Sequence, residues 1–367
     1  MTPAELSRTV LRSVRGAVEE QELSVPVPAR IVVEPPPRPG CGDYASNVAL
    51  QLAGPAGRPA REVAEILRKR LAGSAGIARV EIAGPGFLNF TLGDGALVAL
   101  VREVLAQGDG YGGARAGQDP EVFGDVADVV GPVAGSAAGG AREAVVGEVL
   151  ARIDAAAGPG RRRGGGHPAV APVPYDLATL TARLGSDEAR WVLLRPAAHD
   201  PVRVPERPVQ RESNPRFRVQ YAYARARALV RNAGELGLVS EPGDVGRPAE
   251  VDAPSPTARR APEQAPQHSA PAAAESFPGL HALQTLLATY PSVIDVAARL
   301  RAPDRVVRHL EATADAFFRW HDLFPPLPVG EQKPLAVHRA RLALAEASGT
   351  VLANGLRLLG ISAPAHL

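Results

Sequence analysis

Residues 214–231, NPRFRVQYAYARARALVR, contain five arginines and two tyrosines but no acidic side chain. Asn214 suits the cap of a helix and Pro215 suits its first turn, so the stretch predicts a helix. Like charges three or four residues apart on a helix repel one another unless anions attend them. Arginine binds phosphate through paired hydrogen bonds, so phosphates are natural partners for these side chains. The pattern alone therefore indicates a helix that faces an anion.

This helix would have three faces of different chemistry at 100° per residue. The apolar face comprises Val219, Ala222, Ala226, Leu229 and Val230. The second face comprises Arg216, Gln220, Arg227 and Arg231, and a third strip comprises Arg218, Tyr221 and Arg225. Two hypotheses stay open here. Either the polar faces contact phosphates, or the arginines pair with Glu212, Glu235 and acids of other helices.

Composition restricts the kind of protein that could carry such a helix. The 367 residues have a net charge of +2, so any nucleic-acid site must be a local basic patch. Cys41 is the single cysteine, which excludes an internal disulfide and fits a reducing cytoplasm. Histidines and acids lack the spacing of a metal site, and no apolar run is long enough to span a membrane. We expect a cytoplasmic protein without a metal, a cofactor or a membrane span.

Residues 1–112 and residues 113–176 differ in how strongly their sequences predict regular secondary structure. Residues 1–112 mix helical and strand periodicity, with a β-hairpin near 77–92 and a last helix at about 94–107. Residues 113–176 are rich in glycine and contain one helix, at 141–156. We predict an α+β N-terminal domain followed by a degenerate, flexible linker.

Helical periodicity returns in the rest of the chain. Residues 177–367 predict an all-α bundle, interrupted at 240–276 by a segment whose composition indicates disorder. Its last helices are expected at about 278–290, 291–300, 303–323 and 333–359, separated by prolines. The predicted fold class is thus an α+β N-terminal domain joined by a linker to an all-α helical bundle.

Six segments, in order, resemble the arginyl-tRNA synthetase family. GDYASNVALQLA (42–53) and VEIAGPGFLNFTL (80–92) resemble its N-terminal tRNA-contacting domain. Four later segments resemble its helical anticodon-binding domain, namely SDEARWVLL (186–194), the helix at 214–229, YPSVIDVAA (290–298) and the tail at 351–367. That domain is named DALR after an Asp-Ala-Leu-Arg signature, which stands here loosely as Asp187, Glu188, Ala189 and Arg190.

The resemblance implies RNA-contacting residues in the bundle. Gln220, Tyr221 and Arg225 match the family's VQYAHAR run, in which Tyr223 here replaces the histidine. Arg218, just before this run, replaces a tyrosine of the family. The chain end at Leu367, where the family has methionine, is expected to approach the anticodon. Trp320 either stacks on a base or belongs to the core.

The resemblance also implies a contact with the D-loop of tRNA. Phe87 and Asn89 match an aromatic and an amide residue that contact this loop in the family. Strand alternation places both on one face, with Leu88, Phe90 and Leu92 on the other. The alternative is a hairpin that only packs on its own domain.

The family's catalytic domain lacks a counterpart in this sequence. Its His-x-Gly-His signature appears as Ala137 and Gly140 at the two histidine positions, unless GSAAGG is an ordinary loop. Its lysine-rich loop has no match, because lysine occurs only at Lys69 and Lys333. Residues 113–176 are also too few for a nucleotide-binding sheet covered on both faces. We predict a paralogue that does not charge tRNA, a pseudoenzyme.

Three functional hypotheses follow. The first is a protein that binds tRNA, in particular arginine tRNA, and either has an accessory or regulatory role or presents the tRNA to a tRNA-dependent enzyme. The second is a divergent arginyl-tRNA synthetase that keeps arginine–tRNA ligase activity with ATP. The third is a helical protein-interaction module that does not bind RNA.

Overall fold

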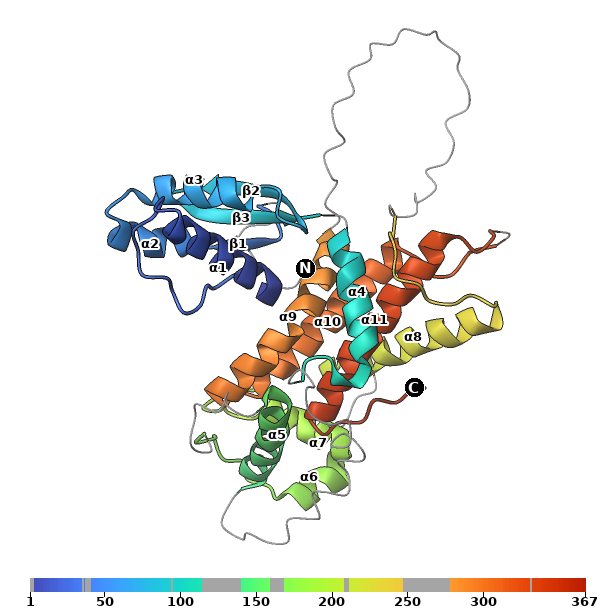
Figure 1. Cartoon of the computed structure of the whole chain (residues 1–367). Coiled ribbons are helices and arrows are strands. Elements are labelled where there is room, and N and C mark those ends of the chain that lie inside the picture. The colour runs from blue at the N-terminus through green and yellow to red at the C-terminus, as the bar shows by residue number, and fades with distance from the viewer. Residues whose placement is uncertain are drawn as a thin grey trace, which may run out of the picture.

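The computed structural model describes residues 3–34, 36, 41–93, 95–113, 140–158, 168–207, 211–246, 278–330 and 332–367. These residues form two hydrophobic cores, one in a small α/β unit and one in a larger helical bundle. Figure 1 shows the α/β unit, in blue, beside the end of α9 and α4. The predicted combination of a small sheet-containing unit with a helical bundle is confirmed.

The α/β unit is a three-stranded antiparallel sheet covered by helices. Its elements are α1 (Pro3–Glu19), β1 (Tyr44–Ser46), α2 (Val48–Ala56), α3 (Ala60–Leu71), β2 (Ile77–Ala83) and β3 (Phe87–Leu92). β3 is the central strand, in the order β1-β3-β2. Its Leu88 and Phe90 are buried against the apolar stripe of the helices, which includes Val10 of α1 and Val63 of α3. A Cβ at Gly86, in the β2–β3 turn, would lie 3.0 Å from Ala60, so this close turn requires glycine.

The helix α4 (Gly95–Gln107) and the turn η1 (Gly108–Gly110) pack on the bundle. Leu100 and Val104 belong to the bundle core, and the Tyr111 hydroxyl donates a hydrogen bond to the carbonyl of Leu287 at 2.9 Å. Asn354 donates to the carbonyls of Gly108 and Tyr111. By its packing, α4 therefore groups with the bundle, whereas the sequence placed it in the first domain.

The predicted flexible linker is not confirmed where the structure describes it. Residues Ala141–Ala157 form α5, whose apolar side chains are buried in the bundle core against α7 and α9. Arg142 of α5 is 1% exposed, and its guanidinium donates to six backbone carbonyls at 2.8–3.4 Å, those of Ala171, Leu193, Pro196, Ala197, Ala198 and Asp200. Local sequence located this helix but not these partners, which lie 29 to 58 residues further along the chain. The glycine-rich residues 114–139 and 159–167 lie outside the described residues.

The bundle is completed by α6 (Leu177–Leu184), α7 (Ser186–Leu194), α8 (Pro215–Glu235), α9 (Pro278–Leu300), α10 (Asp304–Leu323) and α11 (Ala336–Leu358). α11 lies at its centre and packs against α8, α10 and α4. A Cβ at Gly355 would approach Leu310 to 2.4 Å, so α11 and α10 approach closely at this point. None of the described helices combines the length and the apolar character needed to cross a membrane.

Two sequence predictions for the bundle differ from the structure. α9 continues through Pro291 as one helix, although the proline predicted a break. The buried side chains of Tyr290 and Ile294 anchor the helix on both sides of the proline, which offsets the lost hydrogen bond. Residues 240–246, at the start of the predicted disordered insertion, are attached to α11 through Ser240–Glu346 and Arg341–Val245 hydrogen bonds. Residues 247–277 lie outside the described residues.

Candidate functional site

Three of the five arginines of α8 have partners within the protein. Arg216 pairs with Glu188 at 2.6 Å, and Arg218 pairs with Asp315 at 2.6 Å. Arg231 donates to the carbonyl of Ala365 at 3.2 Å. Arg225 and Arg227 are exposed and form no hydrogen bond or ion pair with the residues that the structure describes. Internal pairing thus explains one part of this basic helix, and two cations remain available to a ligand.

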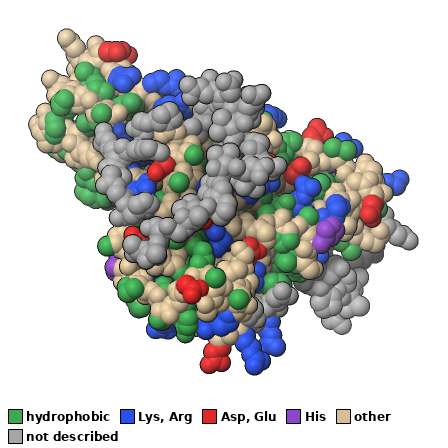
Figure 2. Space-filling view, turned by 90° about the horizontal axis from the view of Figure 1, so that it is seen from below, with side chains coloured by type: hydrophobic (Ala, Val, Ile, Leu, Met, Phe, Trp, Pro, Cys, Tyr) green, Lys and Arg blue, Asp and Glu red, His purple; other side chains and the backbone are tan. Residues whose placement is uncertain are grey.

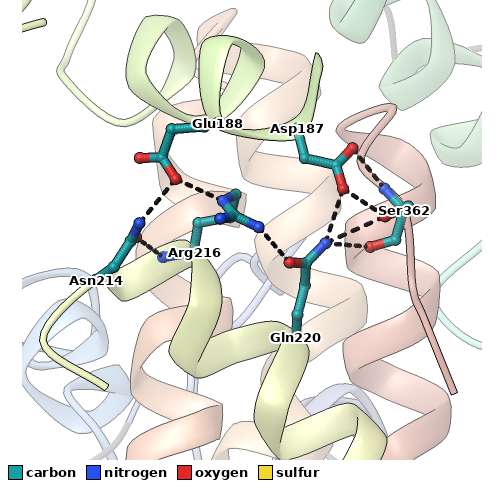
Figure 3. Close-up of polar contacts among 6 residues, drawn as sticks. All are labelled: Asp187, Glu188, Asn214, Arg216, Gln220 and Ser362. Carbon is teal, nitrogen blue, oxygen red and sulfur yellow. Dashed lines mark hydrogen bonds and ion pairs between the residues drawn. The ribbon is translucent and has the colours of Figure 1, made fainter. Parts of the chain in front are cut away.

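The inner side of α8 forms a polar network that connects α7, α8 and the C-terminal tail (Figure 3). We call it the inner network, and its members are Asp187, Glu188, Asn214, Arg216, Gln220 and Ser362. Gln220 is 1% exposed, and its amide nitrogen donates to Asp187 and to the Ser362 carbonyl, each at 2.9 Å. Its amide oxygen accepts from Arg216. A contact of Gln220 with RNA would therefore require these bonds to open.

The signature residues at 187–190 hold separate elements together. The Glu188 carboxylate accepts from Asn214 at 2.8 Å and from Arg216, so it anchors the first turn of α8. Arg190 pairs with Glu148 of α5 at 2.8 Å and donates to the Leu359 carbonyl. Burial alone would raise the pKa of Glu148, but the adjacent Arg190 and Arg152 outweigh burial and lower it. These residues therefore determine where α8 and the tail lie.

An aromatic strip lies on the outer side of α8 and continues onto α10. It consists of Phe217, Tyr221 and Phe318, all half-buried. The rings of Phe217 and Tyr221 stack 6.0 Å apart, and those of Tyr221 and Phe318 stack 5.4 Å apart. The Arg218 guanidinium lies 4.9 Å from the centre of the Phe318 ring. Such a partly exposed row of rings is suited to stacking of unpaired bases.

Arg225 supplies a positive charge beside the aromatic strip. The pKa of His321 is lowered by burial and further by Arg225, so this histidine is neutral near pH 7 and leaves Arg225 as the exposed cation. Figure 2 shows that basic and acidic side chains are interspersed over the described part of the face seen from below. This distribution agrees with the net charge of +2 of the chain.

The remaining predicted site residues in the bundle have different surroundings. Trp320 is fully buried against Phe317 and Phe324, so the structure places it in the core, as the alternative interpretation proposed. Leu367 is exposed at the end of a tail that Asp187, Gln220 and Arg231 hold. Phe318, two residues before Trp320, is half-buried and supplies the partly exposed ring that the sequence suggested at Trp320. The helical spacing of Phe217 and Tyr221 was the signal for the strip that sequence reasoning missed.

In the α/β unit the two predicted contacts differ in exposure. Phe87 is 41% exposed at the start of β3, next to the turn. Asn89 is buried, opposite Ala45 of β1 and Glu81 of β2. The alternation of Leu88, Phe90 and Leu92 toward the core is as predicted. The hairpin thus presents one aromatic ring to solvent, whereas the amide beside it is largely covered.

The region expected to retain the catalytic signature is partly described. Gly140 is the N-cap of α5, and Ala137 lies outside the described residues. Arg142, in the first turn of α5, binds backbone carbonyls of the bundle. Among the described residues no group of three or more histidines, cysteines and acids could hold a metal ion.

Comparison with known proteins gives two family matches. Residues 8–92 match the arginyl tRNA synthetase N terminal domain, and residues 257–367 match the DALR anticodon binding domain. The solved structure of Thermus thermophilus arginyl-tRNA synthetase matches over the full length of both chains with a TM-score of 0.55 and 14% identity. At this identity the structural match supports a similarity of fold.

Curated relatives extend the comparison along the sequence. An arginine–tRNA ligase of Frankia alni is 48% identical over 160 residues, which are 43% of this chain and 28% of that protein. One from Renibacterium salmoninarum is 26% identical in an alignment that covers all of both chains. The second alignment extends over 579 positions, although this chain has 367 residues, so many positions of that relative have no counterpart here.

Proposed function

The chain is related to the arginyl-tRNA synthetases and carries an anticodon-binding domain of the DALR type, and from this premise we propose that it binds tRNA. The observation that carries the proposal is the aromatic strip with Arg225 beside it. Single-stranded RNA is bound by rings that stack on bases and by cations that contact phosphates. The unpaired nucleotides of an anticodon loop offer both bases for stacking and phosphates for the cations.

Arginine tRNA is the proposed partner, and the anticodon loop is its proposed point of contact. Support comes from the relatives, which are named arginine–tRNA ligases. The exposed chain end at Leu367 and the half-buried Tyr221 are proposed to border the bound loop. The inner network positions these groups and need not touch RNA.

We further propose that the protein does not charge tRNA, and that it acts in the cytoplasm as an accessory that presents tRNA to another enzyme. In support, many aligned positions of a full-length relative lack a counterpart, and Gly140 stands where a signature histidine is expected. The alternative, retained ligase activity, predicts ATP–pyrophosphate exchange that depends on arginine. Exchange by the purified chain above the background of a mock preparation would reject the accessory role.

The binding proposal is tested by fluorescence anisotropy with labelled arginine tRNA over a salt series. We expect a Kd below about 1 µM at low salt, and weaker binding as salt rises because phosphate contacts release counterions. A tRNA with the same body but a different anticodon should bind more weakly. Equal affinity for both RNAs would contradict anticodon contact, and no binding at low salt would contradict the proposed function. A stable protein complex that survives ribonuclease would then support the interaction-module hypothesis.

A further inference from the structure

A groove of about 890 Å³ lies at the end of the sheet away from the β2–β3 turn. Its walls come from α1, from the residues before β2 and from the start of α4. Figure 1 shows the chain leaving β3 for α4 at this end. β3 is six residues long, so the groove lies about 20 Å from Phe87 at the other end of the sheet. It is therefore separate from the hairpin contact and from the aromatic strip.

One wall of the groove carries three arginines of α1. Arg8, Arg12 and Arg15 are spaced by four and three residues, so they share one exposed side of the helix. Within the described ranges, Arg12 donates one hydrogen bond, to the Thr9 hydroxyl at 3.2 Å, and Arg15 has no hydrogen bond or ion pair. Like charges at this spacing destabilise a helix unless an anion attends them. In contrast to Arg12 and Arg15, Arg70 on α3 is neutralised by Glu20 and Glu22.

The floor of the groove is made of small residues. It includes Ala75, Gly76, Gly93, Gly95, Ala96 and Ala99. A Cβ added at Gly93 or Gly95 would meet nothing within 4 Å, so packing does not require glycine there and the space above both is open. α4 begins at Gly95, so the positive end of its dipole adjoins the same space. A strand of sugar and phosphate could approach this floor closely.

The charge of the groove selects an anion with several charged groups. Glu5 is the one carboxylate among the described lining residues, against three arginines. Asp94, between Gly93 and Gly95 in the sequence, lies outside the described residues. Along α1 the three arginines rise by about 6 Å and 4.5 Å, so they form a row about 10 Å long. A single small anion would engage only part of this row.

We propose that this groove binds the phosphate backbone of tRNA through Arg12 and Arg15, at a second contact separate from the anticodon surface. The inference rests on the proposed function, because it assigns another region of the same RNA to the α/β unit. The contact involves phosphates and not bases, so it strengthens binding of any tRNA equally. Through this contact the α/β unit contributes to the affinity for tRNA independently of the Phe87 hairpin.

The test compares two double charge reversals in the α/β unit of the full-length chain. Arg12→Glu with Arg15→Glu alters the groove, and the control pair, Arg58→Glu with Arg61→Glu, alters exposed arginines outside it. Labelled arginine tRNA is titrated by anisotropy at several salt concentrations. We expect the groove variant to bind about tenfold more weakly, with the slope of log affinity against log salt reduced by about 1.5 to 2. The control pair should stay within about twofold of the unaltered protein.

Hydroxyl-radical footprinting of the bound tRNA supplies a second readout. The groove variant should lose protection of one backbone segment and keep protection of the anticodon loop. If folding of this variant is impaired by circular dichroism, Arg12→Gln with Arg15→Gln takes its place in the same assays.

The outcomes separate this inference from the proposed function. Failure of the unaltered chain to bind tRNA would reject both. Binding by the unaltered chain, with unchanged affinity, salt slope and footprint in the groove variant, would reject the groove alone. Equal weakening by the control pair would also reject it, because the effect would then be one of general charge.

Discussion

The two sides of α8 use the same residue types for opposite purposes. On the inner side, Arg216 and Gln220 are buried and fully engaged with α7 and the tail. On the outer side, Arg225 is exposed and Tyr221 is half-buried against Phe318. The difference shows that an arginine-rich helix need not be a uniform binding surface. A cation that is already paired stabilises the fold, and one left unpaired can bind a ligand.

The largest loss of stability is expected at Arg142, a second buried arginine whose guanidinium is bonded within the protein. Arg142→Met removes the donors for six backbone carbonyls, and we expect it to lower the free energy of unfolding by about 4 kcal/mol. Urea denaturation measures this change, and Arg305→Met, at an exposed arginine of α10, is the control with an expected change within about 0.5 kcal/mol. Similar losses in the two variants would contradict a structural role specific to Arg142.

The second-largest loss of stability is expected when the inner network is broken. Glu188→Gln leaves the buried Arg216 guanidinium without its counter-charge, which should cost about 3 kcal/mol of folding free energy. Glu235→Gln, at the exposed end of α8, is the matched control. Below the unfolding transition, tRNA affinity of the Glu188 variant should change little. If affinity fell while stability were unchanged, the assignment of this side to folding would be wrong.

The dependence of stability on pH tests the difference between a buried and an exposed histidine. Burial lowers the pKa of His309, next to Tyr290, to about 4. The unfolded chain binds the proton first as pH falls below about 6.5, so His309 lowers stability progressively between pH 6.5 and 4, by about 2 kcal/mol at pH 5.

Denaturation at pH 7 and pH 5 measures this dependence. His309→Gln should reduce the difference between the two pH values, whereas His199→Gln, at an exposed histidine, should leave it unchanged. An undiminished difference in the His309 variant would assign the pH dependence to other groups.

Removing a ring from the aromatic strip should affect binding more than folding. Tyr221→Ala takes away the central ring, and we expect tRNA affinity to fall about tenfold through lost base stacking. Tyr175→Ala, at an exposed tyrosine outside the strip, should leave affinity unchanged. If Tyr221→Ala lost enough stability to account for the weaker binding, Tyr221 would have a structural role like that of the residues on the inner side of α8.

Sequence patterns predicted those features that depend on near neighbours. The Asn214 cap, which accepts from the Arg216 amide at 3.0 Å, and the apolar face of α8 could be derived from local spacing. The roles of Gln220 and Trp320 could not, because they depend on contacts with distant segments. Ser362, for example, reaches Gln220 from 142 positions along the chain.

The same limit explains the errors in the middle of the chain and in α9. α5 has helical periodicity, but its burial depends on α7 and α9, which a local pattern does not include. Pro291 was taken as a break because its effect on the backbone is local, whereas the packing of α9 against α10 extends over the whole helix.

The most direct measurement is the affinity of arginine tRNA for two charge reversals in the bundle, Arg225→Glu and Arg305→Glu. Both arginines are exposed and form no ion pair with described residues, but only Arg225 lies beside the aromatic strip. We predict about tenfold weaker binding for Arg225→Glu and a change within twofold for Arg305→Glu, with both proteins folded. Equal affinities of the two variants would contradict the claim that the outer side of α8 is the binding surface.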